Sequence, residues 1–176
     1  FRLLVFLLSL GFIACGAATA VPDRVETVEP EPSEAELNPA ALKAYSDGIT
    51  AVEGGQLGEA AFHFHKAFEL DERLFRAAYN LGYVHERRGS PSEESLAAYH
   101  RALKVQPEYS PAIAAIARAF HLSGRSDEVL ELVAPVARAN PDDPVIQTVY
   151  ADTLLSEGQH AKAREVAKRA LKRNER

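Results

Sequence analysis

Small and apolar residues recur at a fixed interval along most of the chain. Four glycines mark the interval, with spacings of 34, 35 and 34 residues: Gly55, Gly89, Gly124 and Gly158. A second row of small residues precedes them in step: Gly48, Gly82, Ala117 and Ala151. An interval of this length is typical of a repeated supersecondary unit. The pattern therefore predicts four copies of one unit.

Each unit is predicted to contain two helices joined by a turn. The glycines lie midway through the units, and glycine suits the left-handed conformation that often follows the end of a helix. Pro107 and Pro141 close the second and third units, where the second helix must stop. The pattern predicts an all-α fold with helix-turn-helix units at residues 41–74, 75–109, 110–143 and 144–176.

Two helices per unit and a period of 34 residues resemble the tetratricopeptide repeat (TPR). The most typical stretches are Leu81-Gly82-Tyr83 and Ala102-Leu103-Lys104-Val105-Gln106-Pro107. The resemblance implies a right-handed superhelical solenoid over residues 41–176, in which neighbouring hairpins stack because one hairpin cannot bury its apolar face alone. It also implies a concave groove, lined by the first helices of the units, that binds a protein or peptide partner.

Positions carried over from the family name the side chains expected in that groove. They are Tyr45, Ile49, Tyr79, Tyr83, Arg87, Arg118, His121 and Thr148. Tyrosine and arginine are the residue types that most often dominate binding energy. We expect Tyr79, Tyr83, Arg87 and Arg118 to form the centre of the site, outside the stacked core. The expected partner is an extended segment with an apolar part and a carboxylate.

An apolar run, residues 3–14, follows Arg2 near the start of the chain. Its 12 residues are too few to cross a hydrocarbon core of about 30 Å as a helix. A cationic start, a short apolar stretch and small residues after it match a secretory signal peptide, here residues 1–14. The ending Phe12-Ile13-Ala14-Cys15-Gly16 resembles the bacterial lipobox, which implies that Cys15 is lipidated.

The expected location follows from this leader. Residues 15–40 are acidic, rich in proline and without apolar periodicity, so we expect a disordered tether behind the lipidated Cys15. The chain thus resembles bacterial TPR lipoproteins, which implies an anchor in the cell envelope that faces the periplasm. Gly16 in place of an aspartate favours the outer membrane.

Two other readings of the leader remain open. Ala18-Thr19-Ala20 is an A-x-A cleavage site, and cleavage after Ala20 would release a soluble, chaperone-like TPR binder into the periplasm. Residues upstream of Phe1 could instead lengthen the apolar run into an uncleaved anchor.

Composition and candidate chemistry exclude several other functions. Hydrophobic residues make up 47% of the chain and charged residues 26%, and the net charge is −5, which does not favour nucleic-acid binding. The single cysteine excludes an internal disulfide. His63 and His65 point about 200° apart on a helix, so they cannot share a metal.

No residue pattern in the sequence suggests catalysis. The chain has no G-x-S-x-G motif and no phosphate-binding glycine loop. We therefore expect a membrane-tethered interaction scaffold with no enzyme activity, cofactor, metal or small-molecule substrate. At the end of the array, the outer face of the fourth unit keeps an apolar set, which leaves open whether something docks there: Val166, Ala167, Ala170 and Leu171.

Overall fold

The computed structural model describes residues 37–174 except residue 90, and these residues form eight α-helices. Their bounds are α1 Pro39–Glu53, α2 Leu57–Leu70, α3 Phe75–Arg88, α4 Glu93–Val105, α5 Ser110–Leu122, α6 Ser126–Ala139, α7 Pro144–Ser156 and α8 His160–Asn174. The predicted all-α fold is confirmed, and one pair of consecutive helices corresponds to each predicted unit. The signal peptide, Cys15 and most of the predicted tether lie outside the described residues.

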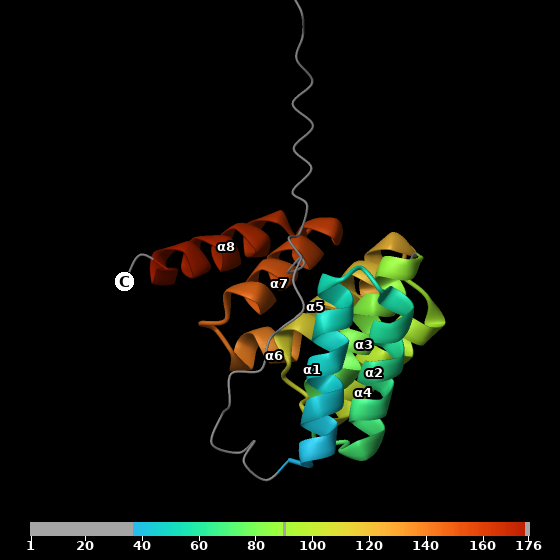
Figure 1. Ribbon diagram of the computed structural model, residues 1–176. Coiled ribbons are helices and arrows are strands. Elements are labelled where there is room, and N and C mark those ends of the chain that lie inside the picture. The colour runs from blue at the N-terminus through green and yellow to red at the C-terminus, as the bar shows by residue number, and fades with distance from the viewer. Residues whose placement is uncertain (1–36, 90, 175–176) are drawn as a thin grey trace, which may run out of the picture.

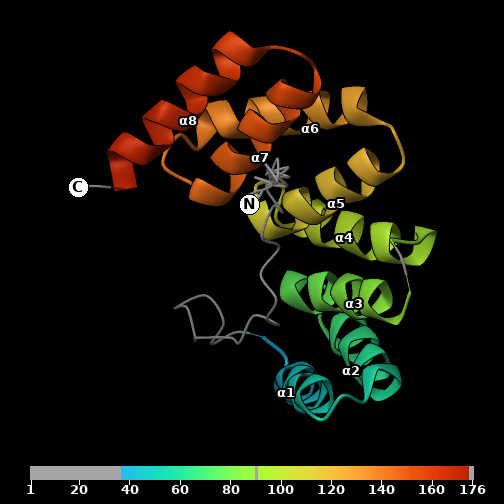
Figure 2. The ribbon, with the colours of Figure 1, turned by 90° about the horizontal axis from the view of Figure 1, so that it is seen from above.

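The helix pairs follow one another in an arc (Figure 2). α2, α4 and α6 lie along its outer side and α1, α3 and α5 along its inner side, while α7 and α8 form the last pair at one end (Figures 1 and 2). Every helix contacts the next one in the chain, and α5 also contacts α7. None of the described helices has the length and apolar character that crossing a membrane requires.

Local residue choice accounts for where the helices begin and turn. Asn38 and Asp143 accept hydrogen bonds from backbone N–H groups at the starts of α1 and α7, and a proline follows each of them in the first turn. The predicted left-handed conformation is found at three of the four turn glycines, with φ of 70–74°. Gly89 is instead extended, with φ of −158°, because the second unit has a longer turn.

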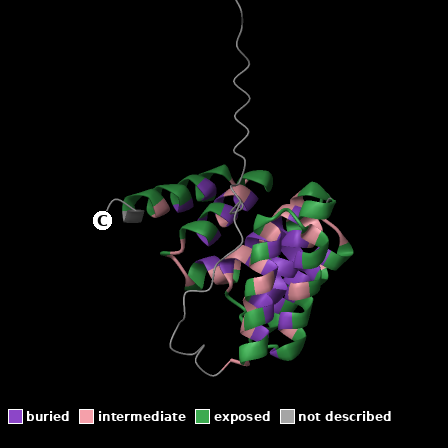
Figure 3. Cartoon of the chain, in the orientation of Figure 1, coloured by how far each residue is buried: buried purple, intermediate pink, exposed green. Residues whose placement is uncertain are grey.

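Small residues bring the two helices of a pair close together. A Cβ atom added at Gly82 would lie 2.7 Å from the Tyr99 ring and 2.9 Å from the Ser95 carbonyl oxygen. At Gly48 it would lie 2.7 Å from the Phe64 ring. Tyr99 and Phe64 are themselves buried, at 1% and 0% exposure. In each of the first two helix pairs, a glycine of the first helix therefore packs directly against an aromatic ring of the second. Figure 3 shows the buried interior in purple.

Candidate binding surface

The first helices of the four units carry two rows of equivalent positions. One row is Ile49, Tyr83, Arg118 and Asp152, and the other is Val52, Glu86, His121 and Leu155. We call them the inner rows, since α1, α3 and α5 line the inner side of the arc (Figure 2). Apolar residues occupy the α1 end of both rows, and Asp152 and Leu155 occupy the α7 end. The side chains between them are polar or charged.

An ion pair occupies the middle of the inner rows. Arg118 of α5 donates two hydrogen bonds to Glu86 of α3, and the one from Nη2 to Oε2 measures 2.8 Å. The Tyr99 hydroxyl donates to the same Oε2 over 2.8 Å. The hydrogen bond to Glu86 raises the pKa of Arg118, although burial opposes it. Because Glu86 neutralises it, the Arg118 charge is already satisfied within the chain.

The predicted groove tyrosines lie in the core. Tyr45, Tyr79 and Tyr83 are only 3%, 1% and 7% exposed. Tyr79 packs against the rings of Tyr99 and Tyr109, with centroid distances of 5.7 and 5.3 Å. The expectation that Tyr79 and Tyr83 lie outside the stacked core is wrong. The small residues that bring helices together leave aromatic rings to fill the remaining space within and between units.

The other predicted residues are at least partly accessible. Ile49 is half-buried against the first-unit core. Arg87 is exposed, and its guanidinium donates to the Tyr83 hydroxyl over 3.0 Å. His121 Nδ1 lies 2.9 Å from the Ser126 hydroxyl. Thr148 is exposed and donates to the Pro144 carbonyl over 2.8 Å. Their role in binding a partner, like that of Arg118, stays a prediction.

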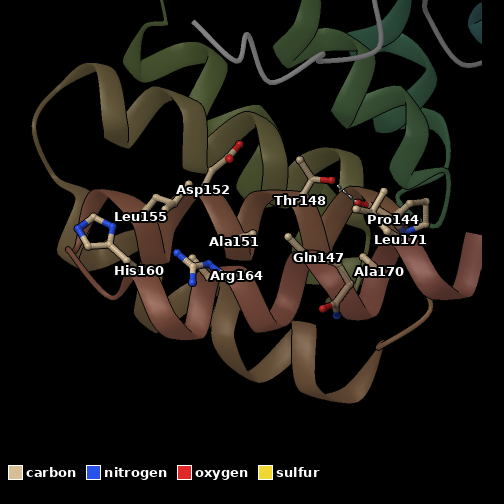
Figure 4. A pocket seen from close by; sticks show the side chains of 12 residues that line it. Pro144, Gln147, Thr148, Ala151, Asp152, Leu155, His160, Arg164, Ala170 and Leu171 are labelled. Atoms are coloured by element: carbon tan, nitrogen blue, oxygen red, sulfur yellow. Dashed lines mark hydrogen bonds between the residues drawn. The ribbon is translucent and has the colours of Figure 1, made fainter. Parts of the chain in front are cut away.

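A groove with a volume of about 580 Å³ lies between α7 and α8. Thr148, Asp152 and Leu155 line it from α7, while α8 contributes residues that include His160, Arg164 and Leu171 (Figure 4). Burial in this groove raises the pKa of Asp152. Leu155 and Leu171 are 49% and 66% exposed. The predicted site included Thr148 here, and the apolar outer face of the last unit indicated the α8 side.

A second hollow, of about 520 Å³, lies between α2 and α3 and brings histidines together. His65 and His85 both line it, and His65 Nδ1 lies 3.4 Å from a carboxylate oxygen of Glu69. Burial lowers the pKa of His85, which favours its neutral form. Within residues 37–174, apart from residue 90, no three His, Cys, Asp or Glu side chains gather as a metal site needs.

Comparison with known proteins agrees with this architecture. Residues 92–153 match the tetratricopeptide repeat family. The solved structure of MamA superposes with a TM-score of 0.65 at 19% identity, covering 78% of this chain and 81% of that one. YrrB, described as a TPR protein with an unusual peptide-binding site, superposes with a TM-score of 0.62 at 17% identity, covering 80% and 72%.

A curated relative matches over a shorter stretch. Photosystem I assembly protein Ycf3 of Rippkaea orientalis (strain PCC 8801 / RF-1) is 30% identical over 84 residues, which are 46% of this chain and 47% of the relative. The match thus spans about half the length of that protein. The fold of the described residues and the match over residues 92–153 together define a class, that of helical repeat proteins. The chain has the fold of the solved tetratricopeptide repeat structures, and residues 92–153 match that family.

Proposed function

We propose that this chain is a protein-binding scaffold that holds a segment of a partner along the inner rows. One observation carries the proposal: apolar side chains stay accessible at both ends of these rows. Ile49 and Val52 are half-buried at the α1 end, and Leu155 is 49% exposed at the α7 end. Accessible apolar side chains at equivalent positions of stacked units can each contact one extended partner segment. The TPR fold supports the same conclusion, since stacked repeats present extended binding surfaces.

The chemistry of the rows indicates which kind of segment fits them. Glu86 and Arg118 neutralise each other, so the centre offers hydrogen-bonding groups without a free cation. A carboxylate in the middle of the partner would compete with Glu86 for the guanidinium and lose its own hydration. The proposed partner is therefore an extended segment with apolar side chains near both ends and an uncharged polar centre.

Photo-crosslinking in intact cells tests this binding mode. A photoreactive amino acid replaces Val52 in one variant and Leu155 in a second, at the two ends of the rows. The matched control places it at Arg101, an exposed position on α4 at the outer side of the arc. Both inner positions are expected to capture the same protein, identified by mass spectrometry. Capture of that protein from Arg101 alone would place the binding face on the outer side and contradict the proposal.

We further propose that Cys15 tethers the scaffold to a membrane of the bacterial cell envelope, the outer membrane, facing the periplasm. Support comes from Phe12-Ile13-Ala14-Cys15 and from the acidic, proline-rich residues that follow. Stable anchoring needs more than one acyl chain, since a single chain binds membranes only marginally. The second candidate is a soluble periplasmic chaperone-like binder, which Ala18-Thr19-Ala20 favours. Membrane fractionation with a high-salt wash separates the two, because salt does not release a lipid anchor.

A further inference from the structure

The outer face of the fourth unit repeats a face that the third unit keeps covered. Val133 and Ala137 of α6 are 0% and 4% exposed, and they share a core cluster with Ile146 and Val149 of α7. The positions equivalent to Val133 and Ala137 in α8 are Ala167, which is exposed, and Leu171, which is 66% exposed. The groove between α7 and α8 therefore has the position and lining of a surface on which one more helix packs.

The chain itself shows how a helix occupies such a surface. Ile146 and Val149 of α7 are 0% and 7% exposed against the third unit. Tyr150 of α7 and Leu130 of α6 pack on a common apolar cluster. Gln147 adds hydrogen bonds from its side-chain amide to the carbonyls of Ala137, over 2.6 Å, and Asn140, over 3.0 Å. One side of α7, which carries Ile146, Val149 and the Gln147 amide, thus fills this kind of groove.

One residue gives the fourth face a different chemistry. Leu96 and Leu130 hold equivalent positions in α4 and α6, whereas α8 has Arg164 there. Arg164 lines the groove, and Figure 4 shows its side chain between α7 and α8. A helix that packed here as α7 packs on α6 would place its counterpart of Tyr150 beside a guanidinium. A carboxylate at this position of the docked helix would form an ion pair with Arg164. The leucines at the equivalent positions of α4 and α6 cannot form such a pair.

The other charged residues of α8 bear on the charge expected of a partner. Lys162, Lys168 and Lys172 are exposed on the same helix. Among the residues that the structure describes, Arg169 pairs with Glu165 and Lys162 contacts Gln159, but no hydrogen bond or ion pair involves Arg164. Of these Lys and Arg side chains only Arg164 lines the groove, where Asp152 is the acidic group. The complementary carboxylate of a partner is therefore expected at Arg164, since complementary charge speeds encounter and excludes other partners.

A second copy of this chain fits the groove poorly. At the other end of the array, the α1 positions equivalent to Ile146, Val149 and Tyr150 are Lys43, Ser46 and Asp47. Lys43 and Asp47 form an exposed ion pair with Nζ 2.8 Å from Oδ2. A head-to-tail contact would bury this polar face against apolar side chains, which is unfavourable. A back-to-back contact would bring two cationic α8 helices together.

We propose that an acidic amphipathic helix of a partner protein docks between α7 and α8, with a carboxylate paired to Arg164. The docked helix continues the stack as the first helix of a fifth unit would. Its apolar side chains cover Leu155, Ala167 and Leu171. This site is distinct from the inner rows, although the two share Asp152 and Leu155.

Binding of two matched peptides to the full chain tests the proposal. Both carry the α7 sequence, residues 144–156, with a helix-stabilising crosslink on the solvent side and a fluorescent label. One has Tyr150→Glu and the other Tyr150→Lys. Fluorescence anisotropy at low salt is expected to show about tenfold tighter binding of the glutamate peptide. In the chain variant Arg164→Glu the order of the two peptides reverses, and Arg164→Leu removes the preference while both peptides still bind.

Several outcomes would overturn the proposal. They are absence of binding by both peptides, equal affinities for the unmodified chain, or a preference that Arg164→Glu does not reverse. A dimer in sedimentation experiments that Leu171→Glu dissociates would assign the groove to a second copy. Binding that appears only after the carboxylates of residues 23–36 are neutralised would assign it to the chain's own acidic segment. None of these outcomes affects crosslinking from Val52, so failure here is distinguishable from failure of the inner-row proposal.

Discussion

Arg118 of α5 and Glu86 of α3 form an ion pair that joins the second and third units across 32 positions of sequence. The Arg118 side chain is 23% exposed and the Glu86 side chain 14% exposed, so water screens the pair only partly. The Tyr99 hydroxyl of α4 completes the arrangement with a third hydrogen bond to Glu86. The pair therefore contributes to the stacking of units, beyond any contact with a partner.

Removing one member of this pair is expected to destabilise the array. Arg118→Ala leaves a mostly buried carboxylate without its cation and should lower the free energy of unfolding by about 2–4 kcal/mol. Urea denaturation measures the change. The matched control is Lys43→Ala, which breaks an exposed ion pair on α1 and should change stability far less. Equal effects of the two substitutions would contradict a structural role for Glu86–Arg118.

Gly82→Ala tests the close approach of α3 and α4. The added methyl group would meet the Tyr99 ring at 2.7 Å and the Ser95 carbonyl oxygen at 2.9 Å, and the backbone oxygen cannot move without α4. We expect a loss of about 1–3 kcal/mol in thermal or urea denaturation. Gly58→Ala in α2 is the control, because no atom lies within 4 Å of its added Cβ. Since Gly58 lies in the first turn of α2, that variant should change stability by no more than about 0.5 kcal/mol, and an equally small change for Gly82→Ala would refute the packing argument.

Asp71 predicts a pH dependence of stability. Its carboxylate accepts hydrogen bonds from the Asn38 backbone N–H over 2.9 Å and from Arg73 Nη2 over 2.8 Å, which ties the end of α2 to the start of α1. The hydrogen bond from Arg73 is the largest cause that lowers the pKa of Asp71 well below its usual range. A lowered pKa means that the ionised form stabilises the fold above pH of about 4, and that this contribution is lost as the pH falls below that value.

Asp71→Asn should therefore cost about 1–2 kcal/mol at pH 7, a modest figure because Arg73 is 59% exposed and screened by solvent. The difference between the two proteins in urea denaturation should stay nearly constant from pH 7 to about 4 and shrink as the pH is lowered further. A difference that does not shrink below a pH of about 4 would show that the charge of Asp71 does not contribute.

The anchor gives a prediction that does not depend on the repeats. Cys15→Ser should move the protein from the membrane fraction to the soluble fraction, because it removes the acylated side chain. Mass spectrometry of the mature protein should find an acylated N-terminal Cys15. A mature N-terminus at Val21 would instead support cleavage after Ala20 and the soluble binder.

By itself the sequence determined the repeat and the number of helix pairs. Glycine at the turns, as at Gly55 and Gly124, and prolines after the second helices act through their own backbone conformations, so their effect is local and visible in the spacing. Small residues such as Gly82 likewise indicated close helix approach before any contact was known. The inner-helix positions of the candidate surface followed from the same register.

Only the tertiary structure decided which of those positions are exposed and which are buried or paired. Tyr79 became core because rings from α4 and from the segment before α5 enclose it, and no spacing within α3 shows that. The charge of Arg118 is paired with that of Glu86, a residue 32 positions away. Arg164 gained its place in a groove because α7 and α8 carry no further unit among the described residues. Burial and pairing of these side chains depend on how units stack, and stacking brings together residues that the local sequence does not relate.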